Sequence, residues 1–189
     1  ATLSFEPSPY AQYMLQLINY ARAHPATAAS VYNVNLNEGL AAGTISTAAK
    51  QPLAFNTSLV YIARYHNLWM QSANTFANIE TSGTYEALTP GQRMHAVIPT
   101  LDAGNTGENI DYLSSTSAFD PIAGTKSLLS DLFLDSKTAG RGRRRNLMDP
   151  NFKEIGAAVN AVNTGDFLGG DAILTTQDFA ATANRHSVH

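Results

Sequence analysis

Two strand-like segments at the end of the chain place the strongest limit on its fold. Residues 154–162 and 172–179 are rich in aliphatic and β-branched residues, and the turn-rich segment 163–171 joins them. Strands joined by so short a connection usually pair antiparallel, so the sequence predicts a closing hairpin. Helical segments fill much of the chain before it, which indicates an α+β fold with helices on both faces of a small antiparallel sheet.

The helical segments are recognised by apolar residues at helical spacing. A hydroxyl residue followed by proline opens the first helix at Ser8 and Pro9, and Pro25 ends it. In the clearest helix, His66 lies on the apolar stripe. The predicted helices cover residues 9–24, 26–32, 57–73, 91–98 and 121–135. A brief strand is expected at residues 110–112, whereas residues 75–89 and 101–108 are predicted as loop and turn.

Residues 141–156 combine a basic cluster with the start of the closing hairpin. Four arginines fall within residues 141–145, where a helix is expected to end, and Asp149 and Pro150 then turn the chain into the strand. The arginines either neutralise the negative end of a helix and pack against carboxylates, or bind phosphate through their guanidinium groups. The net charge of -3 and the pI near 5.9 favour the first interpretation and argue against nucleic acid as a partner.

Length and composition fit a single domain. At 189 residues and 44% hydrophobic content, the chain can bury a core, which we place at residues 9–181 of one domain spanning 1–189. Cysteine is absent, so disulfides, thiolate metal sites and cysteine nucleophiles are excluded. The apolar runs are shorter than the roughly 20 residues that cross a bilayer, so no transmembrane segment is expected.

Eight short blocks follow one another in a fixed order. They are LINYARAHP (17–25), LNEGL (36–40), KQPLAFN (50–56), ARYHNLWM (63–70), FANI (76–79), GENI (107–110), RGRRRNLMDPNFKEIG (141–156) and TTQDFA (175–180). Together they resemble the bacterial secreted branch of the CAP superfamily, the SCP-like proteins that include cysteine-rich secretory proteins, antigen 5 and pathogenesis-related 1 proteins. The resemblance implies a three-layer α-β-α sandwich with a central cleft, and an extracellular location.

In many members of this superfamily the cleft holds two histidines and two acidic residues that can bind a divalent metal. The resemblance places Glu108 at the glutamate of the Gly-Glu-Asn motif, Asn78 at the first histidine and Arg143 at the second. The other acidic position falls near Asp135 or Ser136. Because guanidinium has no lone pair to offer a cation, we expect no metal cofactor at these positions. In its place we expect an ion pair between Arg143 and Glu108, helped by Asn78.

Three features of the sequence allow alternative interpretations. His66 is either a core histidine bonded by a neighbour or a residue that lines the cleft. Glu108 either caps backbone amides in a turn or belongs to the cleft. Residues 102–108 and 163–171 have the oxygen-rich, glycine-rich composition of calcium loops, although neither follows EF-hand spacing.

The sequence shows no catalytic constellation, since a Gly-x-Ser-x-Gly elbow or another nucleophile signature is missing. The first hypothesis, which the resemblance and the replacement of both cleft histidines imply, is a secreted, non-catalytic module whose cleft binds an extracellular lipid, glycan or protein. The rival hypothesis is a peptidase-like hydrolase that acts through the Glu108 cleft. A third is a structural domain within a longer secreted polypeptide.

Overall fold

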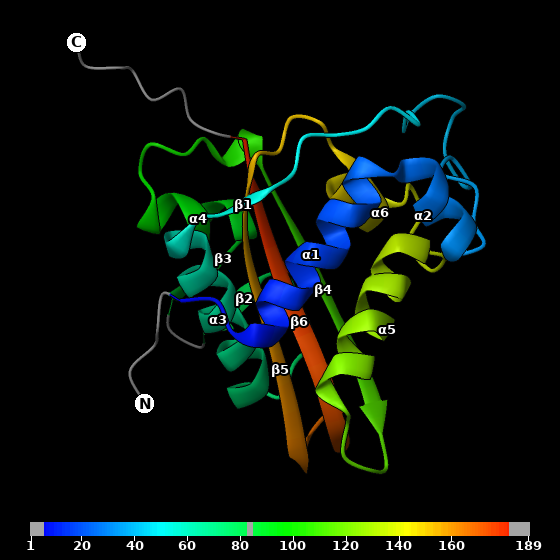
Figure 1. Ribbon diagram of the computed structural model, residues 1–189. Coiled ribbons are helices and arrows are strands. Elements are labelled where there is room, and N and C mark those ends of the chain that lie inside the picture. The colour runs from blue at the N-terminus through cyan, green and yellow to red at the C-terminus, as the bar shows by residue number, and fades with distance from the viewer. Residues whose placement is uncertain (1–5, 83–84, 182–189) are drawn as a thin grey trace.

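A four-stranded sheet with the order β1-β5-β6-β4 forms the centre of the molecule (Figure 1). The structure is a computed structural model that describes residues 6–82 and 85–181. The strands are β1 (Ala54–Phe55), β4 (Thr106–Ser115), β5 (Glu154–Phe167) and β6 (Gly170–Ala180). The predicted hairpin of β5 and β6 is confirmed, and β4 pairs antiparallel with β6. The small sheet was expected to be antiparallel, and it is mixed, because β1 runs parallel to β5.

Hydroxyl side chains cap two of the helices, and the cap at Ser8 is the predicted one. The side chain of Ser8 accepts a hydrogen bond from the backbone N–H of Ala11 (3.2 Å), and Thr89 forms a capping box with Gln92. The helices are α1 (Pro9–Ala23), α2 (Pro25–Val31), α3 (Thr57–Ser72), α4 (Pro90–Val97), α5 (Pro121–Leu134) and α6 (Gly142–Met148), with a short 3-10 turn at Ala103–Asn105. In the described part of the chain, no helix is long and apolar enough to cross a bilayer.

The arginine cluster begins a helix of its own, which corrects the prediction that a helix ends there. The preceding helix α5 already stops at Asp135, whose φ of 44° lies in the left-handed region. The chain then turns and enters α6 at Gly142, so three of the four arginines lie within that helix.

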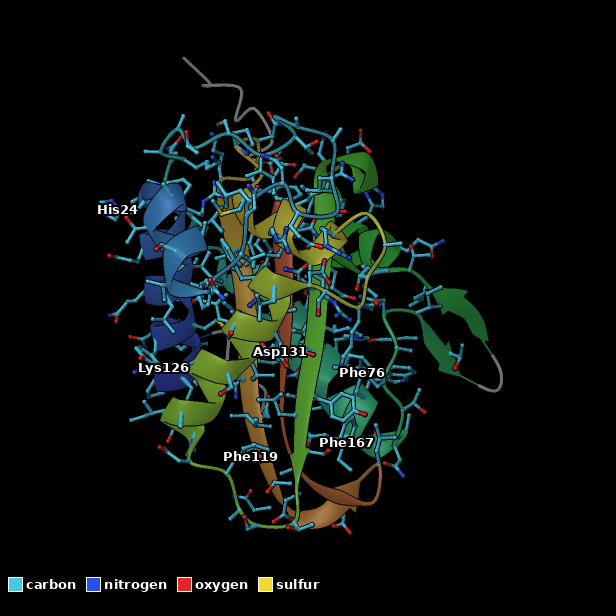
Figure 2. The ribbon with its side chains drawn as sticks, turned by 90° about the vertical axis from the view of Figure 1, so that its right-hand side faces the viewer. His24, Phe76, Phe119, Lys126, Asp131 and Phe167 are labelled. Atoms are coloured by element: carbon cyan, nitrogen blue, oxygen red, sulfur yellow. The ribbon has the colours of Figure 1, made fainter. Side chains whose placement is uncertain are left out.

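Helices cover both faces of the sheet, which confirms the predicted α-β-α sandwich (Figure 2). One face carries α1, α2, α5 and α6 around a core that includes Ile18, Phe133 and Phe179. The opposite face is covered by α3 and α4, where Leu59 and Met94 are buried. Because neighbouring residues of a strand point to opposite faces, each sheet position belongs to one of these two layers.

Two segments predicted as loop or turn contain strands. β2 (Glu80–Ser82) and β3 (Tyr85–Leu88) pair antiparallel within the segment 75–89. β4 begins at Thr106, so the Gly-Glu-Asn motif lies in a strand instead of a turn. Polar side chains hide this strand from a hydrophobic pattern because they bond inside the fold. Asn109, for example, is fully buried and donates to the side-chain oxygen of Gln177 at 3.2 Å.

Candidate functional site

A group of charged side chains lies between the sheet and the layer formed by α3, α4 and the β2–β3 hairpin. We call this group the acid cluster, and its members are His66, Glu80, Arg93, Glu108 and Asp178. All five side chains are at most about a tenth exposed. Buried ionisable groups that gather in this way are frequent at functional sites, because each one perturbs the charge state of the others.

His66 enters the acid cluster from α3 and is fully buried on the apolar stripe, as predicted. Its Nδ1 lies 2.8 Å from Oε1 of Glu80, as in the first of the two interpretations, a core histidine bonded by a neighbour. Its ring stacks on Trp69 with centroids 5.5 Å apart. The other ring nitrogen, Nε2, has no hydrogen-bond partner among the described residues and lies 3.8 Å from Oε1 of Glu108. His66 therefore lies between the two glutamates and is hydrogen-bonded to Glu80.

Arg93 supplies the cation of the acid cluster from α4. Its Nη2 donates to Oε2 of Glu108, and its Nε lies 3.4 Å from Oε1 of Glu80. Its Nη1 also donates to the carbonyl oxygens of Asn78 (2.7 Å) and Leu88 (3.2 Å). One guanidinium group thus joins the β2–β3 hairpin and the segment before it to the sheet.

Glu108 and Asp178 occupy opposite positions on β4 and β6, so their side chains point to the same face. Asp178 is fully buried. Burial raises the pKa of the Asp178 carboxyl well above its usual range, and the neighbouring Glu108 carboxylate raises it further. Asp178 therefore keeps its proton to a higher pH than an ordinary aspartate does.

The predicted ion pair between Arg143 and Glu108 is wrong. Glu108 faces the α3–α4 layer, whereas the next residue, Asn109, points to the opposite face and donates to the carbonyl oxygen of Arg143 (3.2 Å). Arg143 lies with α6 on that second face, and its Nη1 is 3.7 Å from Oδ1 of Asp135. The sheet thus separates Arg143 from Glu108, and Arg93 takes the predicted role.

The four positions mapped from the resemblance form two separate pairs. The amide of Asn78 donates to Oε1 of Glu108 at 2.9 Å, as expected. The backbone N–H of Arg143 donates to Oδ2 of Asp135 at 2.9 Å, so Asp135 and not Ser136 meets Arg143 through its side chain. Both oxygens of Glu108 already accept hydrogen bonds from N–H groups, and the guanidinium of Arg143 occupies the position of the second histidine. These residues do not fit a divalent cation.

The two calcium-like loops use their acidic side chains as backbone caps. Oδ1 of Asp102 accepts from the N–H of Gly104 (2.9 Å), and Oδ1 of Asp171 accepts from the N–H of Gly165 (2.8 Å). Across residues 6–82 and 85–181, no group of three or more histidine, aspartate or glutamate side chains is arranged to hold a metal ion.

The arginines after α5 neutralise a helix end, which confirms the first of the two interpretations. Arg144 is fully buried and donates to the carbonyl oxygens of Phe133 and Leu134 at the end of α5. It also contacts the Glu38 carboxylate, which Arg141 binds through two N–H groups at 3.0 and 2.8 Å. These contacts fasten the segment 35–38 to α5 and α6.

A pocket of about 180 Å³ opens beside the acid cluster. Its walls are mostly apolar and come from α3, β3 and α4, namely Tyr61, Ile62, Tyr65, Leu88, Ala96 and Val97. Glu80 and Arg93 also line it and bring the acid cluster to its surface. Tyr65, Leu88 and Val97 are at least 40% exposed, so three exposed apolar side chains line the opening.

Sequence reasoning missed Glu80, Arg93 and Asp178. Glu80 lies in the segment 75–89, which was predicted as loop, and Arg93 lies in the predicted helix that follows it. Nothing in the residue pattern marks either residue. A signal for Asp178 exists, because residues 175–178 are four consecutive polar residues within a strand and apolar residues flank them. All four are fully buried in β6, and polar residues inside a central strand require partners.

One protein family and two solved structures are similar to this chain. The family model described as "CAP: Cysteine-rich secretory protein family" matches residues 15–179. Among curated proteins, none matches the chain. The "Crystal structure of NaASP2 with Zn2+" is 14% identical with a TM-score of 0.48, over 90% of this chain and 80% of that one. The "Crystal Structure of Na-ASP-1" is 14% identical with a TM-score of 0.47, over 92% of this chain and 38% of that one.

Proposed function

The chain belongs to the cysteine-rich secretory protein (CAP) family, and we propose that it is a secreted, non-catalytic binding module of bacterial origin. Its ligand enters the pocket of Tyr61, Tyr65, Leu88 and Val97 beside the acid cluster. The pocket accepts a small, mostly apolar group, such as an aromatic ring or a short alkyl branch of an extracellular lipid, glycan or protein. The observation that carries this proposal is an apolar pocket beside charged side chains that already pair with one another.

The pocket has the composition of a small-molecule site. Apolar and aromatic walls supply the free energy of binding, and a few polar groups fix orientation. Tyr61 and Tyr65 lie one helical turn apart on α3, with ring centroids 6.4 Å apart, and together form one wall. Two side chains on the same helix face keep a fixed spacing, so this wall is preorganised for a flat group.

The charged residues of the pocket favour binding over hydrolysis. A general base must reach the proton that it removes, directly or through one water. The side chain of Glu108 is 1% exposed, and its two oxygens accept from Asn78 and Arg93. Oε1 of Glu80 is in turn held by His66 and Arg93. These contacts support a structural role for the acid cluster, in which it holds α3, α4 and the hairpin in place around the pocket.

Titration with p-cresol and indole, followed by NMR of the methyl groups, tests the proposal. We expect saturable shifts at Ile62, Leu88, Ala96 and Val97. Val97→Asp should weaken binding about tenfold or more, because it places a carboxylate in an apolar wall. Val31→Asp is the matched control, since both valines are the last residue of a short helix and only Val97 lines the pocket.

Two results would overturn the proposal. Equal binding by the Val97 and Val31 variants, or shifts confined to other regions, would remove the pocket as the binding site. Turnover of a peptide or ester panel that disappears in Glu108→Gln, with unchanged thermal unfolding, would establish the rival hydrolase.

A further inference from the structure

A second, polar pocket of about 100 Å³ lies on the other face of β4, beside the end of α5. Three carboxylates line it, with Asp111 coming from β4, Asp131 from α5 and Asp135 from the C-cap of α5. Lys137 and Arg143 also line this pocket. Figure 2 labels Asp131 where α5 passes beside β4, on the sheet face opposite α3. This pocket is therefore separate from the one beside the acid cluster.

Two buried carboxylate oxygens in this pocket lack a hydrogen-bond donor. Asp111 is 9% exposed and Asp135 is 2% exposed. Oδ2 of Asp111 and Oδ1 of Asp135 have no hydrogen-bond partner within the described residues, and the nearest cation to the latter, Nη1 of Arg143, is 3.7 Å away. Buried acceptors of this kind are costly unless a donor reaches them. Since both residues line the pocket, a donor placed inside it can serve both.

The charges around the pocket leave room for one more cation. When all groups are ionised, the three carboxylates Asp111, Asp131 and Asp135 face two cations, Lys137 and Arg143, which leaves one negative charge. The pKa of Asp111 is raised to about 7, mainly by burial and also by Asp131, while Arg143 and Lys137 oppose the shift. Near neutral pH a proton on Asp111 thus compensates part of the excess charge.

The shape of the site favours an ammonium group over a metal ion. The carboxylates do not converge as metal ligands do in any group of three within the described residues. A primary ammonium carries one positive charge and three N–H donors, which matches one excess charge and separated acceptors. We propose that this pocket binds the primary ammonium group of a small amine, with Oδ2 of Asp111 and Oδ1 of Asp135 as acceptors and Asp131 at the rim.

Titration of the full chain with n-butylammonium, followed by calorimetry and backbone-amide NMR, tests this assignment. Shifts should concentrate around Asp111, Asp131 and Asp135. Tetramethylammonium should bind at least tenfold more weakly, because it has the same charge and no N–H donor. Asp111→Asn should reduce the affinity for butylammonium at least tenfold. Asp166→Asn is the control, because it removes the same charge from an exposed position on β5.

Proton release provides an independent readout. Because the ligand replaces a proton on Asp111, binding should tighten as pH rises through about 7, and calorimetry in two buffers should show proton release that Asp111→Asn abolishes. If Asp111→Asn lowers the unfolding temperature, Asp131→Asn at an exposed position gives the same test, with a smaller expected loss of affinity.

Three results would overturn the assignment. Equal affinity for butylammonium and tetramethylammonium would indicate charge attraction alone. Equal affinity of Asp111→Asn, Asp131→Asn and Asp166→Asn, or the absence of shifts near α5, would exclude this pocket. None of these results bears on the binding of p-cresol or indole on the other sheet face, so the two proposals are tested separately.

Discussion

Glu108 on β4 and Asp178 on β6 lie directly opposite each other on neighbouring strands, and their carboxyl groups share one buried environment on the same face of the sheet. Two ionised carboxylates that are buried side by side would repel each other strongly, so one of them must stay protonated. The protonated one is Asp178, because it is fully buried and its pKa is raised by that burial and by Glu108. The acid cluster is therefore stable only with a particular distribution of protons and charges.

The first prediction concerns the pH dependence of stability. An unfolded aspartate ionises near pH 3.9, whereas folded Asp178 still binds its proton above that pH. The unfolded state thus loses a proton first as pH rises, and Asp178 lowers the free energy of unfolding from about pH 4 upward. Asp178→Asn removes this effect. Its stability relative to the parent protein should therefore improve as pH rises, measured by urea unfolding.

The matched control for this titration is Asp166→Asn, which changes an exposed aspartate. It should shift stability by less than about 0.5 kcal/mol at every pH. A stability difference between Asp178→Asn and the parent protein that stays constant with pH would contradict the proton assignment.

The second prediction concerns the cation of the acid cluster. Arg93→Met keeps the apolar stem but removes the ion pair with Glu80 and the donors to Glu108 and two backbone carbonyl oxygens. Leaving these acceptors buried and unpaired should lower the free energy of unfolding by about 3 kcal/mol or more. Arg64→Met is the control, because Arg64 donates only to the exposed Glu6 carbonyl at 3.1 Å among the contacts described for it. A similar loss of stability in both variants would show that Arg93 has no special role.

Local sequence patterns predicted those parts of the molecule that depend on one element. The helical stripe placed His66 inside, and the arginine cluster indicated that a helix end would be neutralised, as Arg144 does at α5. The family resemblance predicted that Asn78 lies beside Glu108, and the two are hydrogen-bonded. In each case the position of the side chain follows from the helix or motif that carries it.

The incorrect parts depend on contacts between distant elements. Glu108 and Asn109 are neighbours in the chain, yet they face opposite layers of the sandwich, so an error about their face exchanges all their partners. A turn was expected at this motif, and a turn does not send successive side chains to opposite faces as a strand does. The choice of Arg93 over Arg143 therefore required the register of β4 in the sheet, which no single segment contains.

The third prediction separates two adjacent arginines. Arg144 is fully buried and donates to carbonyl oxygens of α5 and of the segment 35–38, whereas Arg145 is exposed. Arg144→Met should lower the free energy of unfolding by about 3 kcal/mol or more, because several carbonyl oxygens lose their donor. Arg145→Met should change it by less than about 0.5 kcal/mol. Guanidinium unfolding of the two variants would decide, and equal effects would contradict the assignment.

The fourth prediction concerns the contact between β5 and α3, which brings α3 close enough to place His66 in the acid cluster. A Cβ atom added to Gly156 would lie 2.0 Å from the carbonyl carbon of Leu59 and 2.4 Å from the backbone nitrogen of Val60. Backbone atoms of a capped helix cannot yield as a flexible side chain does. Gly156→Ala should therefore push α3 away from the sheet and cost about 3 kcal/mol of stability, at the upper end of overpacking effects.

Gly142→Ala is the control for this contact, because Gly142 begins α6 and no heavy atom lies within 4 Å of its added Cβ. Alanine is also the better helix former, so this variant should match the parent protein or exceed its stability slightly. The NMR signals of His66 should shift in Gly156→Ala and stay unchanged in Gly142→Ala, since only the first change displaces α3. If Gly156→Ala were as stable as the parent protein and left His66 unshifted, β5 would not set the position of the helix that carries it.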